Sequence, residues 1–278
     1  MKKLLACLMV LVLCINMVTV CFAEQGEIGI LTQLGVSEDE LNENLQDILF
    51  NVMPFSGFKY FDTFNSLISA LDSGTIEAVE ADEYVSSFLF SHMEGFARYI
   101  PDGLPEYQAG YCMLLREDDV ELRDLISETI QGMQEDGTLE ALKAQYIDDV
   151  IAGNEPEAVV PDHFEGAETL RIALTGDRPP MDYFSAADEP LGFNTALVAE
   201  IARRLQRNVE FISVDAGARA ISLATEASDV IFWSEVGDFN NWEKANAEDQ
   251  PENTIVTSPY LTGTLYYIVK ADSPLANP

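Results

Sequence analysis

Side chains that could carry catalysis are few in this chain of 278 residues. His92 and His163 are the only histidines; the first follows an apolar helical segment and the second lies in an acidic linker, so neither indicates a catalytic triad or a metal cluster. No glycine-rich phosphate loop is present. Pairs of carboxylates are plentiful because the chain has 48 Asp and Glu residues, so they single out no site. The sequence therefore favours binding over catalysis, and it predicts no cofactor and no metal.

The two tryptophans, Trp233 and Trp242, are the side chains best suited to stack on a ring or a cation. A role in the core is the alternative. It is at least as well supported for Trp242, and less so for Trp233, which stands beside polar Ser234. Glu235 is the one further carboxylate that would serve as an acid or base if the protein were an enzyme.

The first 23 residues have the layout of a secretory signal peptide. A positive start precedes an apolar run, and Cys21-Phe22-Ala23 provides the cleavage signal. A retained membrane anchor is the alternative, but the run is short for a spanning helix. A lipid-attached Cys21 is disfavoured because Val20 is bulky. Cleavage would place the protein outside the cytoplasm, secreted or in the periplasm or at the cell surface, with Cys112 as the one remaining cysteine and a buried thiol.

The net charge of the chain is −33. Removal of the first 23 residues would make it −35, because that segment holds two lysines and no acid. So negative a surface repels nucleic acid and anionic lipid and favours solubility. It could attract a cationic solute, although we expect most of these carboxylates to form a solvated surface.

Segments typical of strands and helices alternate at short intervals in the first half of the chain. Strands are predicted at 28–32, 59–61, 75–81 and 110–115, and helices at 37–49, 63–74, 84–90, 119–137 and 139–147. The helix at 37–49 has Ser37 as its N-cap and Glu40 in the capping-box position. Asp62 or Thr63 is expected to cap the next helix, whose apolar residues Leu67, Ile68 and Leu71 fall on one face and which Gly74 ends. Asp119 is expected to cap the long helix, with Val120 facing inward. Such alternation is typical of a parallel sheet covered by helices.

The alternation restarts after an acidic stretch with two prolines, which we interpret as a linker at about residues 148–168. Strands are predicted at 170–174, 209–214, 229–233 and 260–269, and helices at 194–205 and 218–225. Asn194 is expected to be the N-cap of the first of these helices.

Together these segments resemble the family 3 (amino-acid type) extracytoplasmic solute-binding proteins. Residues 171–184, 192–205 and 218–232 resemble the first half-lobe of that family, 258–269 its outgoing hinge strand, 28–31 and 60–83 its second lobe, and 111–147 its closing strand and helices. The resemblance implies an α/β protein with the two-lobed, periplasmic-binding-protein-like clamshell fold (type II). It implies ligand binding and no enzymatic activity.

The order of these pieces departs from the family, which runs from lobe I to lobe II and back. Here residues 24–100 resemble lobe II and residues 101–278 resemble lobe I, so the lobe order is permuted. The linker at 148–168 would join the two former termini. Circular permutation costs little where the cut is exposed and the old ends are close. The alternative is a fragment of a tandem array, which we disfavour because the pieces sum to one complete unit.

The resemblance places the ligand in the cleft between the lobes, beyond the carboxyl ends of the strands. The implied ligand-binding residues are Thr32, Gln33, Asp82, Asp177, Arg178, Met181, Arg219, Trp233 and Ser234. Asp82 stands where the family holds the amino group of the ligand, with a helix N-cap as the alternative. Arg178 and Met181 replace aromatic residues of the family, and Arg219 lies at a helix start that faces the cleft. For both arginines a surface ion pair is the alternative.

The arginine that clamps the ligand carboxylate in the family is missing. It should fall near Asn241, but the segment from Asp238 to Lys244 contains no Arg. Lys244 cannot reproduce a planar bidentate fork. Either Arg178 or Arg219 supplies the anchor, or the ligand is not a simple α-amino acid.

The resemblance therefore implies a monomeric, extracytoplasmic binding protein. It would close about a hinge near Gly110 and Gly263 over a small polar solute, an amino acid or a related compound, and deliver it to an ABC permease. A sensory ligand-binding ectodomain and a dehydratase-like enzyme remain alternatives, because the same scaffold serves all three.

Overall fold

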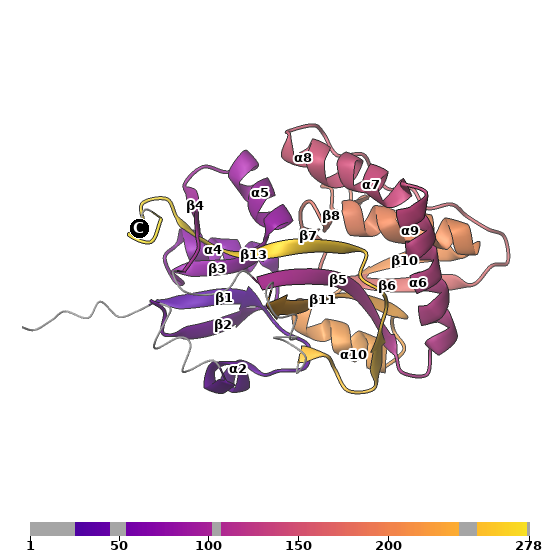
Figure 1. Ribbon diagram of the computed structural model, residues 1–278, viewed down its shortest axis with the longest axis horizontal. Coiled ribbons are helices and arrows are strands. Elements are labelled where there is room, and N and C mark those ends of the chain that lie inside the picture. Colours follow the sequence, from indigo (N-terminus) through magenta and orange to yellow (C-terminus); the bar gives the residue numbers. More distant parts are fainter. Residues whose placement is uncertain (1–25, 45–53, 102–106, 239–248, 277–278) are drawn as a thin grey trace, which may run out of the picture.

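One curled sheet runs through the molecule, with its strands in the order β10-β6-β11-β5-β13-β3-β1-β2 (Figure 1). The computed structural model describes residues 26–44, 54–101, 107–238 and 249–276. The predicted signal peptide lies outside these residues. Among the described helices, none combines the length and the apolar character that crossing a membrane requires.

Lobe II is built on three parallel strands at one end of this sheet. β1 (Glu27–Leu31) lies between β2 (Gly57–Phe61) and β3 (Ala78–Asp82). Its helices are α2 (Glu38–Asn44), α4 (Phe64–Asp72) and α5 (Glu83–His92), and a short strand, β4 (Phe96–Tyr99), pairs with β13. Leu67, Ile68 and Leu71 of α4 are buried, which is the apolar stripe that their spacing predicts.

Lobe I is built on the other end of the sheet. β6 (Thr169–Leu174) pairs in parallel with β10 (Asn208–Ser213) and with β11 (Val230–Asp238). Its helices are α6 (Val120–Glu135), α7 (Thr138–Lys143), a π-helical turn (Ala144–Asp148), α8 (Asp149–Ile151), α9 (Phe193–Leu205) and α10 (Arg219–Ala224), the last after a 3₁₀ turn (Ala216–Ala218). Strand β12 (Thr254–Val256) pairs with β5, and β7 (Asp177–Arg178), β8 (Asp182–Phe184) and β9 (Pro190–Leu191) form a separate small sheet.

Two long antiparallel strands join the lobes. β5 (Tyr107–Arg116) and β13 (Leu261–Lys270) pair through residues 108–111 and 261–264. Beyond the crossing, β13 pairs with β3 of lobe II, whereas β5 pairs with β11 of lobe I along residues 107–114, the crossing included. Gly110 lies opposite Thr262 and Gly263 lies opposite Ala109, so the two predicted hinge glycines are neighbours in the ladder.

Local hydrogen bonds confirm several predicted helix ends. Glu40 accepts from the amide and the hydroxyl of Ser37, which is the capping box that starts α2. Thr63 caps α4, accepting from the amide of Ser66. Gly74, just after that helix, has φ +74°, a conformation that favours glycine.

Other predictions were wrong in ways that long-range packing explains. The sheet is mixed, because the hinge strands run antiparallel to their neighbours. Asn194 is not an N-cap: α9 starts at Phe193 after Gly192, whose φ is +102° and whose position would bring a Cβ within 2.5 Å of the Met181 carbonyl oxygen. Asp119 makes no side-chain cap hydrogen bond, and Val120 is exposed rather than inward. β4, β7, β8, β9 and β12 were not predicted.

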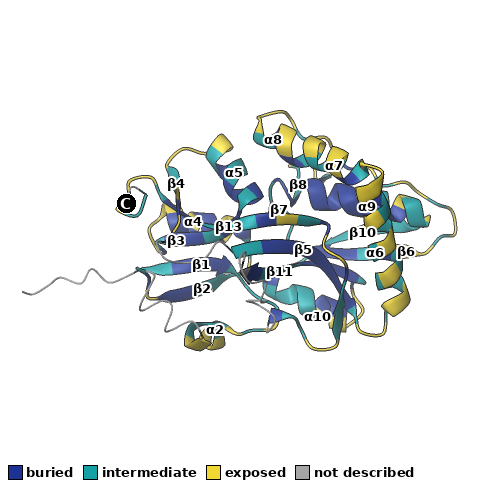
Figure 2. Ribbon diagram, viewed as in Figure 1, coloured by how far each residue is buried: buried dark blue, intermediate teal, exposed yellow. Residues whose placement is uncertain are grey.

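The predicted linker packs on lobe I. Helix α8 extends to Ile151, and residues 152–168 form neither helix nor strand. Val159 is buried and its amide donates to the carbonyl oxygen of Pro190. Figure 2 shows exposed residues along the outer side of α6 and of the helical segment that ends in α8, with the buried residues gathered on the strands and on α9. At the other end of the molecule, Ala276 packs in the same apolar cluster as Ile28.

Candidate functional site

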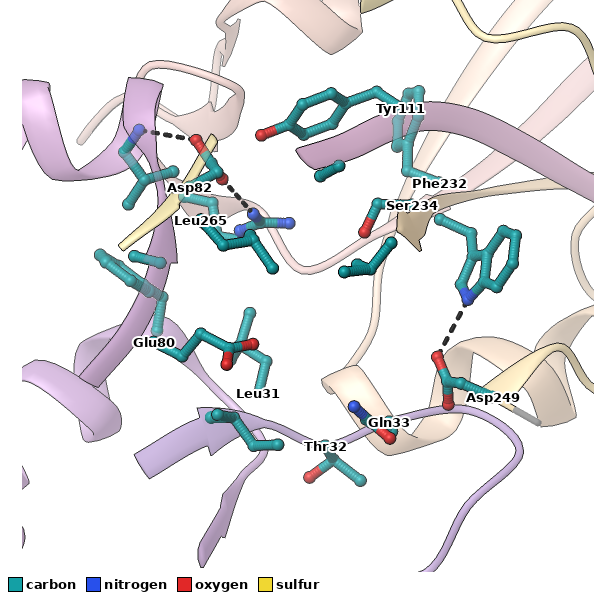
Figure 3. Close-up of a pocket in the computed structure, with 18 of the residues that line it drawn as sticks. Leu31, Thr32, Gln33, Glu80, Asp82, Tyr111, Phe232, Ser234, Asp249 and Leu265 are labelled. Atoms are coloured by element: carbon teal, nitrogen blue, oxygen red, sulfur yellow. Dashed lines mark hydrogen bonds and ion pairs between the residues drawn. The ribbon is translucent and has the colours of Figure 1, made fainter. Parts of the chain in front are cut away.

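A cavity of about 160 Å³ lies between the two lobes, at the edge where several of their strands end (Figure 3). Lobe II contributes Ile30, Leu31, Thr32, Gln33, Phe64, Leu67, Glu80, Ala81, Asp82 and Val85 to its wall. The hinge strands and lobe I contribute Ala109, Tyr111, Arg178, Asn194, Arg219, Phe232, Trp233, Ser234, Val236, Asp249, Tyr260 and Leu265. A cavity of this size is large enough for a small organic guest.

Asp82, at the carboxyl end of β3, uses its two oxygens for two different tasks. Oδ1 accepts from the amides of Tyr84 and Val85, 2.9 Å from each, and so caps helix α5. Oδ2 accepts from Nη2 of Arg178 at 3.0 Å, across the cleft from lobe I. The side chain of Asp82 is 4% exposed. The predicted cap and a charged cleft group are thus the same carboxylate.

Arg178 lies among acids on lobe I. Burial lowers the pKa of its guanidinium, but Asp82, Asp182 and Asp177 outweigh that effect and raise the pKa above its usual value. Arg178 therefore stays charged in the closed cleft. Asp182, which is buried and accepts from Asn194 at 3.1 Å, has its pKa raised to about 6 by burial.

Arg219 begins helix α10 and points its guanidinium at the same cavity. Nε donates to the carbonyl oxygen of Ala216 at 3.1 Å and Nη1 donates to that of Phe232 at 3.0 Å. Burial, together with the nearby charge of Arg178, lowers the pKa of Arg219 to about 10. No carboxylate of the described chain lies within ion-pairing distance of Arg219. Arg219 is thus a fixed cation with donors left for an anionic group.

Asp249 ties the lobes together on the far side of the cavity. It accepts from Nε1 of Trp233 at 2.9 Å and from the amides of Leu34 and Gly35 at 2.6 and 2.9 Å. Burial raises the pKa of Asp249 above its usual value. Trp233 is 6% exposed and packs with Leu114, and it also forms part of the cavity wall.

Two more bonds close the cleft at its rim. The amide of Asn65, at the start of α4, donates to Oδ2 of Asp177 at 2.9 Å, and the amide of Ala216 donates to the carbonyl oxygen of Asp62 at 2.9 Å. With the contacts of Asp82 and Asp249 they join lobe II to lobe I at four places. The structure is therefore a closed clamshell.

Seven of the nine predicted ligand-binding residues line the cavity. They are Thr32, Gln33, Asp82, Arg178, Arg219, Trp233 and Ser234. Asp177 lies at the rim and binds the amide of Asn65, so it closes the lobes rather than facing the cavity. Met181 is fully buried in the main core cluster with Phe193, because the turn before β8 carries its side chain inward. The segment near Asn241, where the family has its clamping arginine, lies outside the described residues, as do Trp242 and Lys244.

Several residues of the wall were not predicted. Glu80 had a signal that was missed: it stands two residues before Asp82 on a strand, and alternate strand residues share a face. Asn194, Asp249 and Tyr260 had none, because each reaches the cavity only through the packing of distant segments. Glu235, the candidate acid or base, is not part of the cavity wall. Within the described residues, no group of three or more acidic, His or Cys side chains is arranged to hold a metal.

Two α/β lobes that close over a polar cavity define a ligand-binding clamshell. Residues 170–275 match the family model described as bacterial extracellular solute-binding proteins, family 3, and this match confirms the predicted family resemblance. The Glutamate-binding protein GluB of Corynebacterium glutamicum is 28% identical over 100 residues, which are 35% of this chain and 34% of that protein. The chain thus matches about a third of the length of this relative.

Solved structures with distant sequences are also similar to this chain. The GluR0 ligand-binding core in complex with L-glutamate is 10% identical, with a TM-score of 0.41, 91% of this chain covered and 88% of that chain. The GluR0 core from Nostoc punctiforme is 12% identical, with a TM-score of 0.41 and coverages of 90% and 86%. The extracellular-binding protein YtmK from Bacillus subtilis is 11% identical, with a TM-score of 0.39 and coverages of 90% and 85%.

Proposed function

We propose that this protein binds a small zwitterionic solute of the amino-acid class outside the cytoplasm and presents it to an ABC permease. One observation carries the proposal: opposite lobes place a carboxylate, Asp82, and an arginine without an ion pair among the described residues, Arg219, on the same closed cavity. A zwitterion has the complementary pair of charges. The match to the solute-binding family supports this class of ligand, and so does the relative GluB, whose name says that it binds glutamate.

The two charged groups divide the ligand between them. The ammonium group of the solute donates to Asp82, where it replaces the Nη2 donor of Arg178 that lies there at 3.0 Å. The carboxylate of the solute accepts from Arg219 and from the released Arg178. Each lobe then holds one end of the ligand, so the closed state binds more tightly than the open one and the ligand shifts the equilibrium towards closure.

The hinge strands provide the axis of this motion. β5 and β13 are the long strands that pass between the lobes, and they pair with each other at the crossing. Bending at residues 108–111 and 261–264 leaves the pairing of β13 with β3 unchanged, and β11, which pairs with residues 108–111, bends together with β5. We extend the proposal to the lobe order: the chain is a circular permutant in which the segment around 152–168 joins the former ends of lobe I.

Isothermal titration calorimetry with a panel of amino acids tests the binding function. We expect at least one α-amino acid to bind. Its α-methyl ester and its N-acetyl derivative should bind at least tenfold more weakly, because each lacks one of the two charges that the cavity pairs. If no α-amino acid binds, or if both derivatives bind as well as the parent compound, the proposal is wrong.

Variants of Asp82 and Arg219 test the same pairing of charges by altering the protein instead of the ligand. Asp82→Asn and Arg219→Gln should each weaken the ligand by tenfold or more. The matched controls are Asp124→Asn and Arg203→Gln, both in exposed ion pairs away from the cleft, and both should retain the affinity within twofold.

Delivery to a permease is tested separately, by measuring transport of the labelled ligand into cells with and without the protein. A signalling response without transport would favour the sensory alternative.

A further inference from the structure

Glu80 is a second carboxylate of lobe II in the wall of the cavity. It stands two residues before Asp82 on β3, so both side chains leave the same face of the strand, about 6.6 Å apart along it. Figure 3 shows the carboxylate of Glu80 directed towards the cavity from the lobe II side. A strand position that faces a cavity next to an anchor is well placed to contact the remainder of the ligand.

Glu80 lacks the strong partners that the other cavity acids have. Asp82 has a guanidinium and two amides, and Asp249 has two amides and an indole N–H. Glu80 has a hydrogen bond with Tyr267 on the neighbouring strand, and burial raises the pKa of its carboxyl to about 7. Among the described residues no Lys or Arg forms an ion pair with Glu80.

The cavity wall carries three carboxylates, those of Glu80, Asp82 and Asp249, and two guanidinium groups, those of Arg178 and Arg219. A zwitterion brings no net charge, so one negative charge of the wall stays unmatched when these groups are ionised. Because Asp249 is already held by two amides and an indole N–H, that charge falls to Glu80. A buried carboxylate without a cation is costly, and an added cation within hydrogen-bonding distance removes that cost. A ligand with one further positive group would complete the pairing.

We infer that the preferred ligand is a dibasic amino acid, with its α-ammonium group at Asp82 and a side-chain cation at Glu80. This inference rests on the proposed function, because it uses Asp82 as the anchor for the α-ammonium group. The spacing of the two acids suits a cation carried on a stem of about three or four methylene groups, as in lysine- and arginine-like solutes. The net charge of −33 favours the approach of such a cation.

An acidic amino acid would meet the opposite situation. With its α-groups at Asp82 and Arg219, its side-chain carboxylate would approach Glu80, and two like charges in a closed cavity repel. A measurement with L-glutamate therefore distinguishes this inference from the alternative that the protein binds the ligand named for its glutamate-binding relative.

The first experiment compares ligands on the unaltered protein by calorimetry at pH 8, where Glu80 is ionised. L-Lysine and L-norleucine differ in the terminal ammonium group, and L-arginine and L-citrulline differ in the guanidinium charge. We expect at least one cationic member to bind tenfold or more tightly than its neutral counterpart, and L-glutamate to bind more weakly than either. Equal affinities within both pairs, or a preference for L-glutamate, would overturn the inference while leaving the proposed function intact. If no amino acid of any charge binds, both proposals fail.

The second experiment removes the charge of Glu80 without changing its shape. Glu80→Gln should reduce the preference for the cationic ligand over its neutral counterpart by at least tenfold, while the affinity for the neutral ligand changes less than threefold. Asp82→Asn should weaken both ligands together, and the exposed Glu94→Gln should change neither. An unchanged preference for the cationic ligand in Glu80→Gln would overturn the assignment of Glu80. If the variant does not fold, the comparison of the ligand pairs on the unaltered protein tests the preference for a cationic ligand.

Discussion

At the scale of single residues, the cavity shows how one carboxylate can cap a helix and face the cleft together. Asp82 gives one oxygen to the first turn of α5 and the other to the cleft. The two hydrogen bonds to α5 hold the carboxylate of Asp82 in a fixed orientation. A ligand that reaches Oδ2 therefore meets a group that is already oriented. The two interpretations of Asp82 that the sequence left open are therefore compatible.

Glu80 gives a prediction about stability in the absence of ligand. Burial raises the pKa of its carboxyl from 4.5 to about 7, so the folded protein binds this proton more tightly than the unfolded chain does. The stability that the protonated form contributes is fully present below pH 4.5 and is lost as the pH rises to about 7. The titratable group that contacts Glu80 is Tyr267, and burial raises the pKa of its hydroxyl well above the usual value, so Tyr267 stays neutral over this range.

Glu80→Gln, which stays neutral, should therefore melt at the same temperature as the unaltered protein near pH 4.5 and about 3 °C or more above it at pH 8. Differential scanning calorimetry at a series of pH values measures this difference. Glu94→Gln is the control, because Glu94 is exposed and should show no such trend. A constant difference at every pH would mean that Glu80 is ionised throughout.

At the scale of elements, the hinge depends on two strands that carry glycine at the crossing. The two glycines are not equivalent. A Cβ on Gly263 would come within 2.9 Å of Cε2 of Tyr84, a buried ring, whereas a Cβ on Gly110 would have no neighbour closer than 3.8 Å. Close packing against α5 therefore requires glycine at 263 but not at 110.

Gly263→Ala should destabilise the protein by about 1–3 kcal/mol, because it overpacks the contact between β13 and α5. Gly110→Ala, in the paired position of the same hinge, should cost less than about 1 kcal/mol. Chemical denaturation of the two variants measures both values. Equal losses would show that flexibility of the hinge, rather than room beside Tyr84, is what glycine supplies there.

At the scale of the whole molecule, lobe order and shape are separate properties. The described chain begins at Gly26 in lobe II, and its other end, at Ala276, packs in the same apolar cluster as Ile28. The segment 152–168 connects α8 to β6 along the surface of lobe I without regular structure. Both places are suited to being cut or joined.

A rewired protein provides the test of permutation. It begins within 152–168, runs to Ala276, continues through a short glycine-serine linker to Gly26, and ends within 152–168. We expect it to fold with the same circular dichroism spectrum and to bind the same ligand within threefold, because every strand keeps its neighbours. A control opened inside β6 should not fold. Failure of the rewired chain to fold would contradict the permutant and favour a tandem fragment.

The sequence by itself determined the features that depend on residues close together along the chain. Ser37 with Glu40, Thr63 and Asp82 each make their cap within three residues, so composition and spacing suffice to place α2, α4 and α5. The alternation of apolar segments likewise identified most strands. The family resemblance added seven residues of the cavity wall.

The tertiary structure alone decided what depends on segments far apart in the chain. The antiparallel pairing of β5 with β13 makes the sheet mixed, and it joins residues that no local pattern connects. Packing turned Met181 into the core and moved Asn194 from a cap to the floor of the cavity, where it bonds Asp182 and Tyr260. Asp249 reaches the amides of Leu34 and Gly35 only because the lobes are closed. Each of these positions is set by the free energy of packing between distant elements, which spacing along the chain does not encode.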